Sequence, residues 1–257
     1  MKIILIGSGN VATVLGKRFQ AAGHTFPQVL SPQAAHAGLL AGLLGAQPIT
    51  TPDALQKDAD LYLIATGDDA VYALGATLRL GDALVAHTAG AVPLDALKNV
   101  SSRYGVLYPL QSLRKEVDPQ VRIPLLIDGS SDSVKAILSN LALQVSDLVN
   151  FCTDRDRLIF HIGAVMVNNF PNYLYTLTET YLTDQGLDWK LLLPLLGETV
   201  GRLDNFSPAE MQTGPAYRGD ERTLALHRAL LEGYPELGEW YSRFSEKIQH
   251  SLAFSRH

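Results

Sequence analysis

The chain of 257 residues is long enough for one large domain or two modest ones, and 47% of its residues are hydrophobic. Its formal net charge of -5 gives no electrostatic support for binding nucleic acid. No stretch has the long uncharged run that a membrane span requires, and the apolar run that ends at Ile6 is too short for a signal peptide. Because Cys152 is the single cysteine, no internal disulfide can form, and we expect a cytoplasmic protein.

Short apolar runs alternate with stretches of helical spacing over the first part of the chain. This alternation predicts an α/β fold with a mainly parallel, Rossmann-type sheet covered by helices on both faces. Uninterrupted apolar runs are typical of strands that are buried on both faces. The predicted strands are residues 3–6, 25–30, 61–65, 83–86, 105–108 and 124–127.

The pattern changes after about residue 150, where no further strand is evident. We therefore predict a dinucleotide-binding domain of residues 1–150, followed by an all-helical C-terminal domain of residues 151–257. The predicted helices of this second part are residues 154–185, 189–203, 222–231 and 238–252.

A glycine-rich loop lies between the first strand and the first helix. In Gly7-Ser8-Gly9-Asn10-Val11-Ala12, the first glycine permits a tight bend and the second lets a pyrophosphate approach the backbone. The small alanine lets the helix pack close to the strand, and the helix N-terminus faces the phosphates. We predict that residues 7 to 11 bind a dinucleotide. The alternatives are a tight turn without a ligand and an S-adenosylmethionine site.

The end of the second strand bears on which dinucleotide binds. NAD-preferring sites usually have an acidic residue there, but the chain has none before Asp53. Ser31 can donate a hydrogen bond to a 2′-phosphate, although residues 32–34 include no arginine. The sequence therefore favours NADP over NAD as the cofactor.

Small polar residues follow two further strands, where the carboxyl edge of the sheet would hold the cofactor. We predict that Thr66 and Gly67 contact the cofactor and that His87 and Thr88 lie near the nicotinamide. As alternatives, Asp68 caps the next helix and backbone groups satisfy His87.

The helical stretch at residues 154–175 carries a polar face. His161, Asn168 and Asn172 are spaced seven and four residues apart, so a regular helix places them on one face, with small side chains between them. Because the rest of the helix is apolar, we expect it to be buried, and buried amides and imidazoles need partners. The partner is either a substrate or nicotinamide, or else the neighbouring domain or a second subunit.

A second polar cluster lies at residues 214–227. Arg218 stands in a glycine-rich turn and suits a phosphate or carboxylate, while Asp220 is placed to cap the next helix. Thr223 and His227 share a face of that helix. A structural pairing of Arg218 with Asp220 is the alternative. The histidines of the chain lack the local spacing of metal ligands, so no metal site is predicted.

Together these stretches resemble a bacterial family, Rossmann-like and domain of unknown function 2520. This family is related to the 6-phosphogluconate dehydrogenases, ketopantoate reductases, pyrroline-5-carboxylate reductases and deazaflavin-dependent NADP reductases. The resemblance implies a Rossmann domain followed by a helical domain, a homodimer formed through the helical half, and an NAD(P)-dependent oxidoreductase of unknown substrate. The segments that show the resemblance are GSGNVA (7–12), ATGDDAV (65–71), AHTAG (86–90), YPLQS (108–112), FHIGAVMVNNF (160–170) and TGPAYRGDERTLALH (213–227).

The chain departs from the family pattern at two places and from related dehydrogenases at a third. Tyr108 stands where the pattern often has histidine, and Ser31-Pro32 stands where it often has Ser-Arg. The related β-hydroxyacid dehydrogenases use a lysine four residues before an asparagine, but Ala164 precedes Asn168 here. His161 is the best substitute for the missing lysine on that face.

The sequence supports two hypotheses. In the first, the protein transfers a hydride between NADP(H), less readily NAD(H), and a small carbonyl or imine substrate. His161 donates the proton, Asn168 orients the substrate oxygen, and Asn172 and Arg218 bind the substrate. In the second, the protein is a catalytically silent NAD(P)-sensing module that acts through a protein partner, as the missing lysine suggests.

Overall fold

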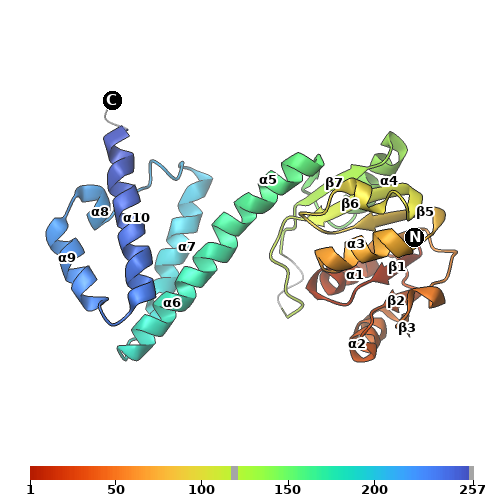
Figure 1. Cartoon of the computed structure of the whole chain (residues 1–257), viewed down its shortest axis with the longest axis horizontal. Coiled ribbons are helices and arrows are strands. Elements are labelled where there is room, and N and C mark those ends of the chain that lie inside the picture. Colours follow the sequence, from red (N-terminus) through yellow and green to blue (C-terminus); the bar gives the residue numbers. More distant parts are fainter. Residues whose placement is uncertain (117–120, 255–257) are drawn as a thin grey trace. The chain divides into compact units, whose positions relative to one another are not determined.

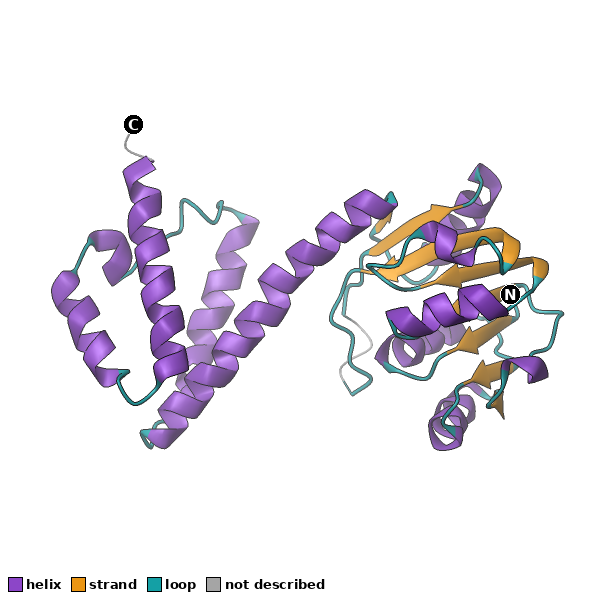
Figure 2. Ribbon diagram, viewed as in Figure 1, coloured by secondary structure: helices purple, strands orange, loops and turns teal. Residues whose placement is uncertain are grey.

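The computed structural model describes residues 1–116 and 121–254, and for residues 251–254 only the backbone. The chain divides into two compact units, Met1–Asn168 and Asn169–His257, which we describe separately. The first unit contains the whole sheet and the first helix after it. The second contains only helices and turns in its described residues (Figure 2).

The first unit is built on one eight-stranded sheet with the order β3-β2-β1-β4-β5-β6-β7-β8 (Figure 1). Every pairing is parallel except that of β6 with β7. The predicted α/β class is confirmed. The strands are β1 (Ile3–Ile6), β2 (Gln28–Leu30), β3 (Gln47–Ile49), β4 (Leu61–Ile64), β5 (Gly81–His87), β6 (Ser101–Pro109), β7 (Leu125–Gly129) and β8 (Val149–Phe151).

Helices cover both faces of the sheet, as the apolar runs predict. Ile3 and Leu5 of β1 pack with side chains of α1, α2 and α4, whereas Ile4 and Ile6 pack on the opposite face with side chains of α3. All four side chains are buried because successive residues of a strand point to opposite faces. The helices of this unit are α1 (Asn10–Ala21), α2 (Ala34–Leu44), α3 (Asp68–Thr77), α4 (Asp132–Ala142) and α5 (Asp154–Ala164).

The predicted helix at 154–185 is not one regular α-helix. After α5, residues Val165–Asn169 form a π-helical turn, and α6 begins at Phe170. A π turn inserts extra chain into the helix and rotates the residues beyond it about the helix axis. The spacing argument that placed His161 and Asn168 on one face assumes a regular α-helix, so it does not hold here.

The second unit buries very little of itself. Its helices are α6 (Phe170–Asp184), α7 (Leu193–Gly201), α8 (Pro215–Arg218), α9 (Glu221–Leu230) and α10 (Pro235–Phe254), as the all-helical prediction requires. Among its described side chains, the buried ones are Ala216, Leu224, Leu231 and Ser245. The expected burial of the stretch 154–175 is wrong for the single chain: Arg157 is the buried residue of α5, and α6 has none. In the described residues, no helix combines the length and apolar character needed to cross a membrane.

Candidate nucleotide site and sheet edge

The β1–α1 turn requires glycine at its first position. Gly7 has a φ of +118°, and a Cβ atom there would lie 2.1 Å from the carbonyl oxygen of Ala65 at the end of β4. No side chain fits between the two backbones, so glycine is required here because the ends of β1 and β4 approach each other closely. Its predicted contact with a dinucleotide is not needed to explain the glycine.

Gly9 is different, because nothing in the protein requires it. Its φ is -81°, and a Cβ atom there would meet nothing within 4 Å. Gly9 is the N-cap of α1, which has no side-chain cap and no acidic residue in its first turn. The start of α1 thus has no side-chain cap, and the protein leaves room at Gly9 beside it, which is the arrangement that suits a phosphate.

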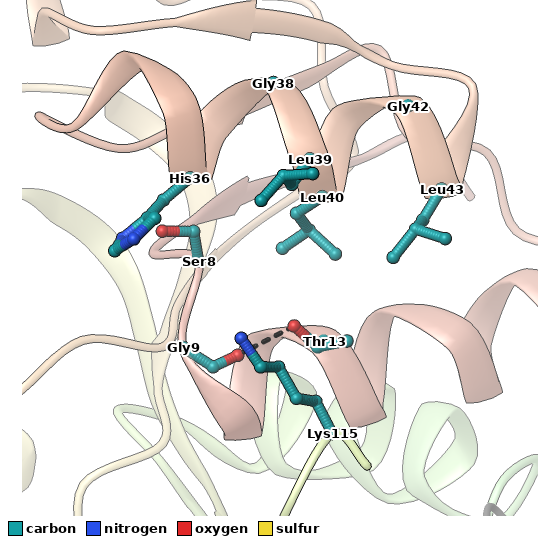
Figure 3. A pocket seen from close by; sticks show the side chains of 10 residues that line it. All are labelled: Ser8, Gly9, Thr13, His36, Gly38, Leu39, Leu40, Gly42, Leu43 and Lys115. Atoms are coloured by element: carbon teal, nitrogen blue, oxygen red, sulfur yellow. Dashed lines mark hydrogen bonds between the residues drawn. The ribbon is translucent and has the colours of Figure 1, made fainter.

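A cavity of about 600 Å³ opens beside this turn, between α1 and α2 (Figure 3). Ser8 reaches the end of β2, where its Oγ donates to the Oγ of Ser31 over 2.8 Å. The predicted residues Ser8 and Gly9 line the cavity, Asn10 is exposed, and Val11 is half-buried against the core. The complete lining is Ser8, Gly9, Thr13, His36, Gly38, Leu39, Leu40, Gly42, Leu43 and Lys115.

Sequence reasoning missed His36 and Lys115 in this lining. His36 lies in the first turn of α2 and carries no motif signal. Lys115 reaches the site from far along the chain, and its backbone N–H donates to Oδ1 of Asn10 over 3.3 Å. Such a contact depends on the tertiary fold, so no local pattern could have indicated it.

The ends of β4 and β5 hold the other predicted cofactor residues. Thr66 is half-buried, and Gly67 rather than Asp68 is the N-cap of α3, which corrects the capping alternative. Thr88 is buried, and its N–H donates to the carbonyl oxygen of Ile64 over 3.0 Å. The backbone of Thr88 thus continues the β4–β5 pairing.

His87 is fully buried at the end of β5. Its Nδ1 accepts a hydrogen bond from the N–H of Ala89 over 3.2 Å, while Nε2 meets the hydrogen-bond criteria with none of the described residues. Burial, and then the nearby positive charge of Arg157, lower the pKa of His87 to about 4. The imidazole is therefore neutral at physiological pH, and the N–H of Ala89 satisfies its Nδ1.

Arg157 fastens α5 to the segment that follows β5. Its side chain is 1% exposed, and its guanidinium donates to the carbonyl oxygens of Gly90 and Val92 and to Oδ1 of Asp154. The same Asp154 oxygen accepts from the N–H of Leu94 over 2.9 Å. Sequence reasoning missed these hydrogen bonds of Arg157, because an arginine in an amphipathic stretch normally faces solvent.

Tyr108 and His161 contact each other next to Gly90, in the segment that follows β5. The Tyr108 hydroxyl lies 3.0 Å from Nδ1 of His161. A Cβ atom at Gly90 would lie 2.9 Å from that nitrogen and from Cζ of Tyr108, so glycine leaves room for the pair. Burial raises the pKa of Tyr108, which keeps its phenol protonated. The departure from the family pattern at Tyr108 thus places a phenol beside His161.

The remaining predicted residues are exposed. Asn168 lies in the π turn, Asn172 on α6, and Arg218 at the end of α8. In the described part of the chain, no ion pair joins Arg218 to Asp220. Asp220 caps α9 as predicted, because its side chain accepts from the N–H of Thr223 over 3.1 Å.

A protein family model matches part of the chain, and a solved structure matches nearly all of it. The family model described as Domain of unknown function (DUF2520) matches residues 123–248. A Bacteroides fragilis protein described as an NADP oxidoreductase has 32% identity and a TM-score of 0.90, over 97% of this chain and 98% of that one. No curated protein matches the chain.

More distant solved structures share the fold. A reductive aminase from Aspergillus terreus, solved with NADPH, has 16% identity and a TM-score of 0.67, over 99% of this chain and 94% of that one. A 1-pyrroline-5-carboxylate reductase from Streptococcus pyogenes has 14% identity and a TM-score of 0.62, over 97% of this chain and 98% of that one.

Proposed function

Because this chain belongs to the family of the Domain of unknown function (DUF2520), we propose that it is an NAD(P)-dependent oxidoreductase acting on a small carbonyl or imine. The observation that carries the proposal is the uncapped start of α1 at Gly9, which faces open space next to a cavity. The names of the structural neighbours, which include NADP-dependent and imine-reducing enzymes, support it.

The residues present fit a nicotinamide dinucleotide. Gly9 leaves room for a pyrophosphate at the start of α1, and the cavity beyond it lies at the carboxyl ends of β1 and β2. When bound, the reduced nicotinamide supplies a hydride to the carbonyl or imine carbon, and the oxygen or nitrogen then needs a proton.

His161 is our proposed donor of that proton. The Tyr108 hydroxyl lies 3.0 Å from Nδ1 of His161, and when the imidazole carries both protons its Nδ1–H donates to the phenol oxygen, which leaves Nε2–H for the substrate. As a general acid His161 would act from its imidazolium form: Nε2–H would give its proton to the substrate heteroatom, leaving a neutral imidazole with its proton on Nδ1, and the product would be an alcohol or amine. Tyr108 acts as a positioning residue that sets the orientation and tautomer of His161. Asn168, Asn172 and Arg218 stay our predicted substrate contacts.

The nucleotide site is tested by titrating the full chain with NADPH, NADH, NADP and NAD and following nicotinamide fluorescence or its competition. Gly9→Ala should leave the fold intact, since its Cβ meets open space, but should weaken binding at least about tenfold by blocking the pyrophosphate. Gly197→Ala in α7, also in open space, is the control and should bind as the wild type does. Equal affinity of Gly9→Ala and wild type would remove the main support for the proposal.

The role of His161 is tested by turnover with NADPH and a panel of small keto acids and cyclic imines. His161→Ala should lower kcat by about 10²-fold with nucleotide affinity unchanged, because proton transfer is lost. Tyr108→Phe should lower kcat less and should move the pH profile, since the hydrogen bond at Nδ1 is lost. Unchanged turnover of His161→Ala would assign the proton to another group.

One observation favours a catalytically silent sensor as a second candidate. Ala164 occupies the place of the lysine used by related dehydrogenases. In that case the protein would bind NADPH, show no hydride transfer to any acceptor in the panel, and bind a partner protein only with the nucleotide present.

We further propose that a second copy of the chain covers the helical unit. Large apolar side chains are exposed there, including Leu191 at 79%, Leu230 at 66% and Val200 at 65%. So many exposed apolar side chains, with so few buried ones, indicate a surface made for a protein partner. The resemblance to a dimeric family favours a homodimer, which sedimentation velocity measures directly.

A further inference from the structure

The cavity between α1 and α2 has basic residues in its lining, on a protein that is acidic overall. The chain carries a net charge of -5, yet the lining includes Lys115 and His36 and no acidic residue. In the described residues, the adjacent Arg114 pairs with Glu116 over 3.9 Å, whereas Lys115 forms no ion pair. Figure 3 shows the Lys115 side chain on the α1 side of the cavity, which Gly9 and Thr13 also line. The charge of Lys115 is therefore available to an anion.

The position of this cavity in the fold identifies the anion. Ser31 follows the last residue of β2, and its Oγ accepts from Ser8, which lines the cavity. In a sheet with this strand order, the ribose 2′ position of a bound dinucleotide lies beyond the end of β2. His36 stands in the first turn of α2, which has no acidic residue and no side-chain cap. A dianionic group at the 2′ position would thus lie among donors with no competing carboxylate.

The α2 side of the cavity also carries apolar side chains that suit a flat apolar group. Leu39 is 70% exposed and Leu43 is 56% exposed, and both line the cavity with the buried Leu40. A volume of about 600 Å³ is in the range of small-molecule sites. An adenine ring against these leucines would cover side chains that are otherwise left in water.

We infer that Lys115, assisted by His36, binds the adenosine 2′-phosphate and so selects NADPH over NADH. The inference rests on the proposed function and assigns the role that an arginine after β2 would otherwise play. The lysine comes instead from the loop after β6, held in place by the hydrogen bond from its own backbone N–H to Asn10.

The test measures dissociation constants of NADPH and NADH for the full chain, with Lys115→Met and His36→Gln as variants. Lys115→Met should weaken NADPH about tenfold or more and leave NADH within about twofold, because only NADPH loses a charge-assisted contact. His36→Gln should act in the same direction with a smaller effect. Arg114→Met is the matched control and should change neither constant, since Arg114 does not line the cavity.

A second probe isolates the phosphate. Adenosine 2′-monophosphate should compete with NADPH better than adenosine 5′-monophosphate does, and Lys115→Met should remove the difference. An equal loss of NADPH and NADH affinity in Lys115→Met would place the lysine on the pyrophosphate and overturn this inference, while the proposed function stands. If the wild type binds neither dinucleotide, the proposed function itself fails.

Discussion

Replacing Arg157 with Met is expected to lower the free energy of unfolding by about 3 kcal/mol. The guanidinium is 1% exposed and donates to two backbone carbonyls and a carboxylate, which a thioether cannot do. Methionine fills a similar volume, so the loss reports the unsatisfied acceptors rather than a void. Because Asp154 is 44% exposed and can turn to water, we place the loss at the low end for a broken buried pair.

The measurement is urea unfolding followed by far-ultraviolet circular dichroism. Arg155→Met on the same helix is the matched control, and its loss should stay within about 0.5 kcal/mol because Arg155 is exposed. Arg157→Lys should lie between the two, since one ammonium group cannot reach all three acceptors. Equal stabilities of Arg157→Met and Arg155→Met would show that the hydrogen bonds of Arg157 contribute nothing to the free energy of unfolding.

The buried His87 should make stability depend on pH. Its pKa is about 4 in the folded protein and about 6.5 when unfolded, so the unfolded state binds more protons between these values. The free energy of unfolding therefore falls as the pH falls from about 6.5 to about 4, and this group accounts for about 2 kcal/mol of loss by about pH 5.

His87→Asn separates this contribution from the carboxylates, which titrate in both proteins. An asparagine Oδ1 can accept the hydrogen bond from Ala89 but does not take up a proton. The stability difference between wild type and variant should shift by about 2 kcal/mol in favour of the variant between about pH 7.5 and about pH 5. His36→Asn, at an exposed histidine, is the control and should retain the wild-type dependence. Parallel curves for wild type and His87→Asn would contradict the prediction.

Local features of the site were predictable and long-range ones were not. The turn at Gly7 and the cap at Asp220 are encoded within a few residues, and the structure confirms the strand-to-helix turn and the cap. The short strands β3 and β8 were missed because three residues without an apolar run give no periodic signal.

The contacts that assemble the sheet edge join residues far apart in sequence. The Tyr108–His161 pair and the Arg157–Gly90 hydrogen bond span 53 and 67 residues. The π turn after Ala164 defeated the spacing argument, because hydrophobic periodicity reports an average pitch and not an inserted residue.

The uneven distribution of the buried core has a consequence for how the protein is made. During synthesis the sheet unit leaves the ribosome first, and it can bury both faces of β1 and β4 without the helices beyond residue 168. The helical unit emerges later, with leucines and phenylalanines still in water. If a second copy covers them, as we propose, these side chains stay exposed until another finished chain arrives. Under the proposed homodimer, encounter between copies, rather than formation of the sheet, would set how long aggregation can compete.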